Sequence, residues 1–255
     1  MWDPGQYGRF ADERSRPFFE LVRRIGAERP AAVVDLGCGT GTLTATLAER
    51  WPGAAVEGVD SSPEMIAGAA ALAVPGRLGF TRGDLRDWRP SAPVDVIVSN
   101  AVLQWVPEHA ALLERWVACL RPGGWLAFQV PGNDESPSHV LLASLRRSER
   151  WRGRAGDGRP GHRVLEPEDY LRRLAALGCS VDAWETTYLH VLQGTDPVLE
   201  WVKGSALRPV LQALGAGPER EAFLAEYAAL LREAYPAGPL GTVLPFRRLF
   251  VVARR

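Results

Sequence analysis

Short apolar segments alternate with helix-like segments through the first half of the chain. Ala31–Leu36 is a β-branched run that ends in a glycine-rich turn, and apolar residues then recur at helical spacing from Leu43 to Ala48. Strands that alternate with helices in this way pair in parallel through right-handed crossovers, so the pattern predicts a doubly wound α/β sheet of the Rossmann-like class. Further strands are expected at Ala55–Val59, Leu78–Thr81, Val94–Ser99 and Trp125–Val130, and helices at Pro63–Leu72 and around Leu112–Leu120.

The alternation ends after Pro131. Residues 132–161 are rich in Gly, Pro, Ser and Arg, and the patterns that follow are mostly helical. We predict helices over Asp12–Arg29, Glu166–Leu177, Pro197–Leu214 and Pro218–Tyr235, and strands over Ser180–Leu192 and Arg247–Ala253. A chain of 255 residues can bury one large core. We therefore expect a single domain, made of a leading helical segment (1–29), a core (31–131), helical cap insertions (132–178 and 193–240) and final strands (180–192 and 245–255).

Charge and composition exclude several functional classes. The 30 Lys and Arg residues balance the 30 Asp and Glu residues, so no net field attracts nucleic acid or an anionic membrane. Met1–Gly5 begins no signal-peptide pattern, and polar residues interrupt the most apolar stretch, Val94–Val106, well short of the roughly 20 residues of a membrane span. Cys38, Cys119 and Cys179 are an odd number without close spacing, which is typical of a reducing compartment. We expect a monomeric cytoplasmic protein that binds neither nucleic acid nor membrane.

Three acidic residues stand where predicted parallel strands end. Asp35 precedes the turn Gly37–Gly41, Asp60 ends the second strand and Asp84 follows the third. Open α/β sheets bind ligands at this edge, and glycines let the backbone approach a ligand closely. Asp60 can accept hydrogen bonds from both hydroxyls of a ribose, and Asp84 from the amine of adenine while the Leu85 amide serves a ring nitrogen. The set predicts an adenosine site; the alternative is that each Asp only caps the helix that follows it.

The residues around the turn favour an amino-acid tail over a pyrophosphate. A dinucleotide fingerprint needs glycine at position 42, where this chain has Thr42. Asp35 repels a pyrophosphate but can accept from an ammonium group, directly or through water. We interpret Cys38 as filler of the turn rather than as a nucleophile, because no basic residue stands near it in the sequence.

With the motifs Asp35–Gly41, Asp60 and Asp84, the segment Ala31–Val130 resembles the class I S-adenosylmethionine methyltransferases. The resemblance implies a seven-stranded, mostly parallel sheet whose last strand is antiparallel. It also implies S-adenosylmethionine as the cofactor, with Asn100 beside the methionine part and the reactive methyl. The cofactor-binding residues that it implies are Asp35, Gly37, Gly39, Gly41, Asp60, Ser61, Met65, Asp84, Leu85 and Asn100.

Stretches outside this core resemble one family in particular, the trans-aconitate 2-methyltransferases. They span most of the chain, except that residues 132–161 are richer in Gly and Arg than the family pattern. The resemblance implies esterification of one carboxylate of trans-aconitate, which gives a monomethyl ester and S-adenosylhomocysteine. The matching stretches are Trp2-Asp3-Pro4 with Tyr7 and Phe10, Glu13–Pro17, Asp60–Pro63, Asn100–His109, Thr186–His190, Trp201-Val202, Leu207-Arg208-Pro209 and Pro245–Arg255.

A carboxylate acceptor limits what the protein must supply. The acid is already deprotonated at neutral pH, so its attack on a sulfonium methyl needs no general base, and we assign no catalytic residue. The protein must orient the acid and neutralise its remaining carboxylates, which suits arginine forks. The substrate-binding candidates are Tyr7, Arg14, Gln104, Trp105, His109, Tyr188, His190, Lys203, Arg208 and Arg248.

We favour Arg248 among these candidates. An antiparallel last strand begins at the edge where the parallel strands end, and strand alternation sends Arg247 and Arg248 to opposite faces. The resemblance places its arginine at Arg248 and leaves Arg247 as a solvated rim charge. Tyr188 and His190, two residues apart, share one face of the preceding strand.

Other interpretations of these residues stay open. His190 can be a structural histidine, Trp105 a core indole, and Arg14 a partner in a surface salt bridge. Lys203 and Arg208, which we expect on one cap helix, can be solvated charges.

Other functions stay open as well. Another small acid, such as malonyl carrier protein, could be the acceptor, although a carrier needs a basic docking face that the neutral composition disfavours. Other small-molecule methyltransferases are possible too, whereas Thr42 and Asp84 argue against a dinucleotide-binding or non-catalytic module. His139 and His162 lack metal-ligand spacing, so no metal is expected.

Overall fold

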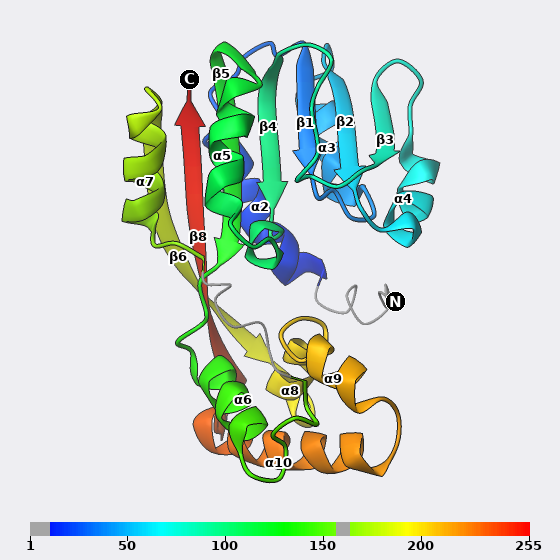
Figure 1. Ribbon diagram of the computed structural model, residues 1–255, viewed down its shortest axis with the longest axis vertical. Coiled ribbons are helices and arrows are strands. Elements are labelled where there is room, and N and C mark those ends of the chain that lie inside the picture. Colours follow the sequence, from blue (N-terminus) through cyan, green and yellow to red (C-terminus); the bar gives the residue numbers. More distant parts are fainter. Residues whose placement is uncertain (1–10, 157–163) are drawn as a thin grey trace. The chain divides into compact units, whose positions relative to one another are not determined.

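The computed structural model describes residues 11–156 and 164–255, with the backbone alone for residues 11–14. The chain divides into two units, whose elements are labelled in Figure 1. The core unit comprises residues 14–131, 164–185 and 248–255. The cap unit comprises residues 1–13, 132–163 and 186–247.

The core unit is built on a sheet with the strand order β3-β2-β1-β4-β5-β8-β6. Strands β3 to β5 of this order pair in parallel, and β8 pairs antiparallel with β5. This confirms the predicted doubly wound sheet with an antiparallel last strand. A short strand, β7, pairs with β8 and makes eight strands in the described residues; two residues leave no pattern from which to predict it. The bounds are β1 Ala32–Leu36, β2 Ala55–Asp60, β3 Leu78–Arg82, β4 Val94–Asn100, β5 Leu120–Pro131, β6 Ser180–Leu192, β7 Ala237–Gly238 and β8 Gly241–Arg254.

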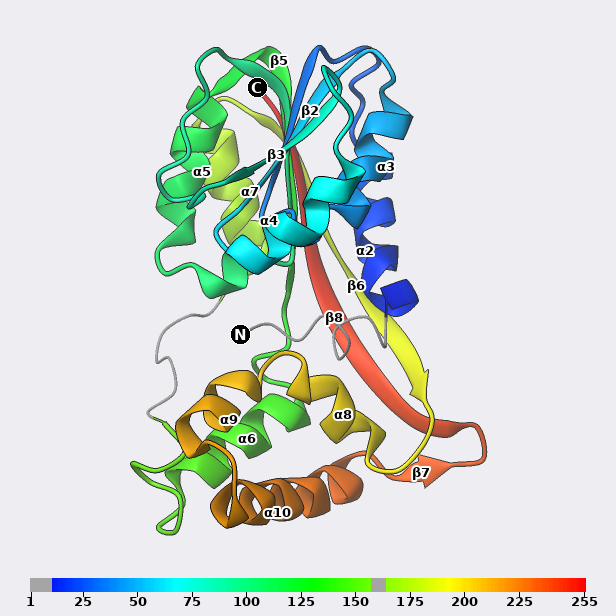
Figure 2. The same ribbon diagram turned by 90° about the vertical axis from the view of Figure 1, so that its right-hand side faces the viewer.

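Helices cover both faces of this sheet. Figure 2 shows α2 and α3 on one face and α5 and α7 on the other. Val96, Ile97 and Val98 of β4 are therefore fully buried, which explains why this strand is a continuous apolar run in the sequence. Helix α2 ends at Arg23 rather than at the predicted Arg29, shortly before Gly26, a poor helix former. The bounds are α2 Ala11–Arg23, α3 Thr42–Arg50, α4 Pro63–Ala69, η1 Ala70–Leu72, η2 Leu103–Trp105, α5 His109–Ala118 and α7 Pro167–Ala176.

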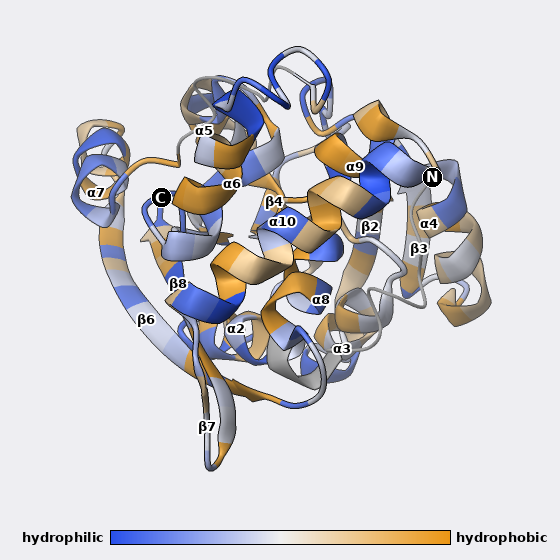
Figure 3. Cartoon of the chain, turned by 90° about the horizontal axis from the view of Figure 1, so that it is seen from below, coloured by the Kyte–Doolittle hydropathy of each residue, from blue (hydrophilic) through white to orange (hydrophobic). Residues whose placement is uncertain are grey.

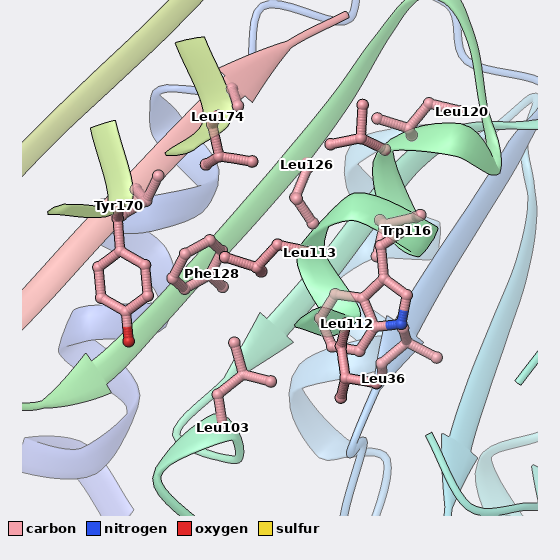
Figure 4. Close-up of a cluster of buried hydrophobic side chains, with 14 of the residues drawn as sticks. Leu36, Leu103, Leu112, Leu113, Trp116, Leu120, Leu126, Phe128, Tyr170 and Leu174 are labelled. Atoms are coloured by element: carbon pink, nitrogen blue, oxygen red, sulfur yellow. The ribbon is translucent and has the colours of Figure 1, made fainter. Parts of the chain in front are cut away.

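Helix α7 packs into the core unit, although the sequence analysis assigned its residues to a cap insertion. Tyr170 and Leu174, one helical turn apart, are fully buried in a cluster with Phe128 of β5 and with Leu113 and Trp116 of α5 (Figure 4). The Tyr170 ring lies edge-on to Phe128, with 5.0 Å between the ring centroids. Burial of such side chains stabilises the fold by about 1.5–3 kcal/mol each, which holds α7 against the sheet.

The described part of the cap unit is mainly helical. Its helices pack around Trp151, Trp201, Phe223 and Tyr227, which are fully buried. These helices carry both hydrophobic and hydrophilic residues (Figure 3), so their hydrophobic side chains can be buried while hydrophilic ones stay at the surface. The bounds are α6 Pro137–Arg147, α8 Pro197–Lys203, α9 Arg208–Leu214 and α10 Pro218–Ala234.

Two features of the cap unit differ from the sequence prediction. Helix α6 lies within residues 132–161, where the Gly and Arg content masked its helical spacing. The single helix predicted over Pro197–Leu214 is wrong, because it is interrupted between α8 and α9. Gly204 ends α8, and Pro209 stands in the first turn of α9, where its missing N–H cannot continue a helix from the preceding residues.

Candidate functional site

The turn after β1 requires glycine at two positions. Gly37 and Gly41 have φ values of 86° and 76°, which L side chains rarely adopt. A Cβ at Gly37 would lie 2.2 Å from Cγ2 of Val102, and one at Gly41 would lie 2.6 Å from the Phe80 ring. At Gly39, also of positive φ, a Cβ would meet nothing within 4 Å in the described residues. The turn is closely packed at two glycines and open at the third, which leaves backbone for a ligand to approach.

We expect Gly37→Ala to lower the free energy of unfolding by about 2 kcal/mol, because the new methyl group overlaps Val102 and the φ value is strained. Gly79→Ala is the matched control, since a Cβ there meets nothing within 4 Å and no left-handed φ is needed. Urea denaturation of both variants checks the prediction. Equal stability of the two variants would contradict the packing described for the turn.

Asp35 is buried with only half of its carboxylate engaged. The residue is 2% exposed, and Oδ2 accepts a hydrogen bond from Thr44 Oγ1 at 2.6 Å. Oδ1 has no hydrogen-bond partner among the described residues. Burial raises the pKa of Asp35 to about 6, against the opposing effect of the Thr44 bond. A buried acceptor that lacks a donor fits an ammonium group or a bridging water.

Asp60 holds the glycine turn through backbone amides. Its Oδ2 accepts from Gly39 N at 2.9 Å and its Oδ1 from Ser62 N at 2.9 Å. Burial, together with the negative charges of Asp35 and Asp60, raises the pKa of the Cys38 thiol far above its usual range. Cys38 is therefore protonated at neutral pH, in agreement with its interpretation as filler.

Asp84 is bound by Arg86, which the sequence analysis did not single out. Arg86 Nε lies 3.0 Å from each carboxylate oxygen, Nη2 lies 2.5 Å from Oδ2, and the Arg86 amide donates to Oδ1 at 2.8 Å. These hydrogen bonds and the charge of Arg86 lower the pKa of Asp84. The single Nε–H is shared between the two oxygens, so three N–H groups serve the roughly four acceptor positions of the carboxylate, and Asp84 can still accept from a ligand amine. Gly83 N donates to the Asp60 carbonyl at 3.0 Å and joins this loop to the end of β2.

The other predicted cofactor residues belong to the same edge of the sheet. Ser62 caps α4 by accepting from Met65 N at 3.2 Å, and the Met65 side chain is buried. Ser61 is exposed beside Asp60, and Leu85 packs partly against the core cluster. The predicted cofactor set thus lies at the carboxyl ends of β1 to β4 and in the segments that follow them, which for Met65 is the first turn of α4.

Asn100 ends β4 in a row of three hydrogen-bonded side chains. Gln129 Nε2 donates to Asn100 Oδ1 at 2.6 Å, and Arg248 Nη1 donates to Gln129 Oε1 at 3.4 Å. Both Gln129 and Arg248 are buried. Ala101 follows with a φ of 57°, and strain of this kind in residues other than glycine concentrates at functional sites.

Three acceptor candidates of the core unit differ in their surroundings. Gln104 Nε2 donates to the Ala101 carbonyl at 2.6 Å and so braces the turn after β4. Trp105 is 39% exposed and is therefore not the core indole of the alternative interpretation. His109 is buried, with Nε2 2.7 Å from Tyr170 Oη and Nδ1 3.3 Å from a backbone carbonyl, which favours a structural role.

Two acceptor candidates of the cap unit lie on β6. Tyr188 and His190 are both buried, on one face of the strand as their spacing predicted. The His190 ring centroid lies 4.6 Å from that of Trp201, 6.1 Å from that of Phe246 and 6.2 Å from that of Tyr188. These surroundings are typical of a structural histidine.

The remaining candidates are separated in the sequence and in their elements. Lys203, at the end of α8, has its Nζ 2.5 Å from Glu200 Oε1, whereas Arg208 begins α9. The prediction that Lys203 and Arg208 share one helix is therefore wrong. Tyr7 lies outside the described residues, as does the side chain of Arg14.

Asn133, a residue that the sequence analysis missed, fixes the backbone next to Arg248. In the cap unit, its Nδ2 donates to the Arg247 carbonyl at 3.0 Å, and its Oδ1 accepts from Arg247 N at 2.9 Å. Asn133 is buried and Arg247 is half-buried. The two residues are 114 positions apart, so no local sequence signal could have identified this pair.

The described residues contain neither a cluster of metal ligands nor a membrane-spanning helix. No three His, Cys, Asp or Glu side chains are grouped as metal ligands there. None of the helices in residues 11–156 and 164–255 combines the length and apolar character that crossing a membrane requires.

Solved structures share this fold. The YcgJ protein from Bacillus subtilis matches with a TM-score of 0.58 at 13% identity, covering 93% of this chain and 97% of that one. The plantazolicin methyltransferase BpumL in complex with S-adenosylhomocysteine matches with a TM-score of 0.50 at 15% identity, covering 99% of this chain and 86% of that one. At these identities the likeness shows the fold alone.

Sequence relatives give a closer assignment. The methyltransferase domain family matches residues 10–183. Proteins named trans-aconitate 2-methyltransferase are 56% identical in Streptomyces avermitilis and 54% identical in Rhodococcus jostii, each over 100% of this chain and over 97% and 99% of the relative. The protein of that name in Mycobacterium tuberculosis is 52% identical over 99% of this chain and 96% of the relative. The chain therefore belongs to the trans-aconitate 2-methyltransferase family of the methyltransferase-domain proteins.

Proposed function

We propose that the protein transfers a methyl group from S-adenosylmethionine to one carboxylate of trans-aconitate, giving the monomethyl ester and S-adenosylhomocysteine. The observation that carries this proposal is the 52–56% identity, over nearly full length, to relatives named for this reaction. Independent support for S-adenosylmethionine as the methyl donor comes from three acids at the strand ends. They are Asp35, whose buried Oδ1 has no hydrogen-bond partner among the described residues, Asp60 and Asp84.

The residues at the strand ends fit S-adenosylmethionine, which supplies an electrophilic methyl group on a sulfonium. Asp35 Oδ1 would accept from the ammonium of the methionine part, directly or through water. Asp60 would accept from the ribose hydroxyls, and Asp84 with the Leu85 amide would hold the adenine. Asn100 would lie beside the methionine part, and the open backbone at Gly39 would admit the donor closely.

The acceptor needs charge neutralisation and orientation rather than proton transfer. Its carboxylates are ionised at neutral pH, so the attacking oxygen carries its own lone pair and no general base is required. Arg248 is a buried cation, and low surrounding polarity strengthens its attraction for a carboxylate. Holding the attacking oxygen in line with the methyl group then lowers the barrier. The other acceptor-binding residues of this proposal are Tyr7, Arg14, Gln104, Trp105, His109, Tyr188, His190, Lys203 and Arg208.

One assay tests the reaction. The purified protein is incubated with S-adenosylmethionine and, separately, trans-aconitate, cis-aconitate, citrate or malonyl carrier protein, and ester products are detected by mass spectrometry. The proposal expects the monomethyl ester of trans-aconitate as the main product. Turnover of the carrier protein without turnover of any free tricarboxylate would overturn the acceptor. Absence of S-adenosylhomocysteine binding in calorimetry would also overturn the assignment of S-adenosylmethionine as the methyl donor.

The cellular location that we propose is the cytoplasm. Cys38, Cys119 and Cys179 form no disulfide in the described residues, and free thiols are typical of a reducing compartment. We further propose that the protein acts there as a monomer.

A further inference from the structure

Gln129 occupies an unusual position for a side-chain amide. It lies in the middle of the sheet on β5, is 1% exposed, and stands in register with Asn100 of β4. The next strand, β8, begins its pairing with β5 at Arg248 opposite Pro131. A buried amide on a central strand destabilises the fold unless both of its ends are hydrogen-bonded, which makes its partners informative.

The chemistry of these partners fixes which group donates and which accepts in the two hydrogen bonds that join Arg248, Gln129 and Asn100. Arginine has only donors, so the Gln129 atom that faces Arg248 must be Oε1. The amide nitrogen of Gln129 must then face Asn100, which requires the Asn100 oxygen to point back at it. The Nδ2 group of Asn100 is thereby turned away from Gln129, with its two N–H groups directed elsewhere.

Rotating either amide would be unfavourable. A flipped Gln129 would place its NH₂ group against the Arg248 guanidinium, and a flipped Asn100 would place two NH₂ groups against each other. Gln129 is too deeply buried for bulk water to satisfy such groups, so the observed polarity is strongly preferred.

We propose that Gln129 is a positioning residue that uses the fixed polarity of Arg248 to orient the Asn100 amide toward the methyl donor. This inference rests on the proposed function, in which Asn100 lies beside the methionine part and Arg248 binds the acceptor. Gln129 contacts Asn100 and Arg248, one residue from each of the two proposed sites, and acts only through them.

Two variants test the inference. Gln129→Met keeps the volume and removes both hydrogen bonds, and we expect S-adenosylhomocysteine affinity and the KM for trans-aconitate each to worsen by about five- to tenfold. Gln129→Glu should raise the KM for trans-aconitate more than Gln129→Met does, because its carboxylate neutralises the charge of Arg248. The same carboxylate accepts from a flipped Asn100 amide, so the Asn100 orientation is lost as well. Calorimetry with S-adenosylhomocysteine and steady-state kinetics measure both effects. The control is Tyr227→Phe, which loses a buried hydrogen bond to the Ser138 carbonyl in the cap unit and should change stability only.

The decisive measurement is non-additivity. In an Asn100→Ala background, Gln129→Met should cause no further loss of S-adenosylhomocysteine affinity, because its effect passes through Asn100. Additive losses would overturn the inference, as would a Gln129→Met protein that is less stable but retains wild-type affinity and KM. If Gln129→Met fails to fold, the same comparison is made with Gln129→Glu. Failure of the wild-type protein to bind S-adenosylhomocysteine or to methylate trans-aconitate would instead count against the proposed function.

Discussion

Replacing Arg248 by Gln is expected to lower kcat/KM for trans-aconitate about 100-fold, mainly through KM. The guanidinium is buried on β8, and hydrogen bonds to charged groups contribute about 1.5–3 kcal/mol each. Glutamine removes the charge, and because its shorter amide side chain can accept as well as donate, it no longer fixes the polarity of Gln129 and Asn100. Affinity for S-adenosylhomocysteine should therefore fall by no more than in Gln129→Met, about five- to tenfold, which is well below the loss for the acceptor. Steady-state kinetics and calorimetry on the same preparation measure both quantities.

Arg248→Lys is the matched control for charge. It keeps the positive charge but loses the planar fork, so its KM should lie between those of the wild-type protein and Arg248→Gln. If Arg248→Gln loses donor affinity as strongly as acceptor affinity, Arg248 does not act as an acceptor residue.

Replacing Asp35 by Asn is expected to raise the free energy of unfolding and to weaken binding of S-adenosylhomocysteine. Burial raises the pKa of Asp35 from its ordinary value of 3.8 to about 6 in the folded state. Between these pH values the folded protein holds a proton that the unfolded chain has released, so stability falls as the pH rises through this window. Above it, the ionised carboxylate destabilises the wild-type protein by about 3 kcal/mol. Asparagine stays neutral and can still accept from Thr44, so its free energy of unfolding near neutral pH should be higher by about 2 kcal/mol.

The same substitution should weaken S-adenosylhomocysteine binding by at least about tenfold, because a neutral amide attracts an ammonium far less than a carboxylate does. Urea denaturation near neutral pH and again below pH 4 checks the stability effect, which should vanish at the lower pH. Asp84→Asn is the control. Arg86 lowers the pKa of Asp84, so the ionised Asp84 carboxylate does not destabilise the fold and its replacement should bring no gain in stability. An Asp35→Asn protein that is less stable at neutral pH, or that binds the product normally, would contradict this account.

The sheet was largely predictable because buried parallel strands are continuous apolar runs. Val94–Asn100 stands within a residue of the predicted strand for this reason. Ser180–Leu192 at the edge of the sheet was found instead from its alternation, since Tyr188, His190 and Leu192 are buried and the residues between them are exposed. Helices of the cap unit were less predictable. The break between α8 and α9 depends on Pro209 within an otherwise helical pattern, and α6 lies in a segment whose Gly and Arg content masked the helical spacing.

The side chains of the candidate site divide in a similar way. Asp35, Asp60 and Asp84 were identifiable because each follows its strand directly in the sequence. Gln129 and Asn133 were not, because their partners are set by the register of β5 and β8 and by contacts across more than a hundred residues. Arg86 stands two residues from Asp84, yet exposed Arg residues are too common in this chain for that spacing to have been informative.

Strands β6 and β8 each contribute residues to both units, with the divisions after Glu185 and after Arg247. Chimeric enzymes that exchange the cap between family members would therefore have to be spliced inside a strand at these two joints rather than at loops. Because a shift of one residue reverses which side chains face inward, such grafts will tolerate substitutions near the joints far better than insertions or deletions.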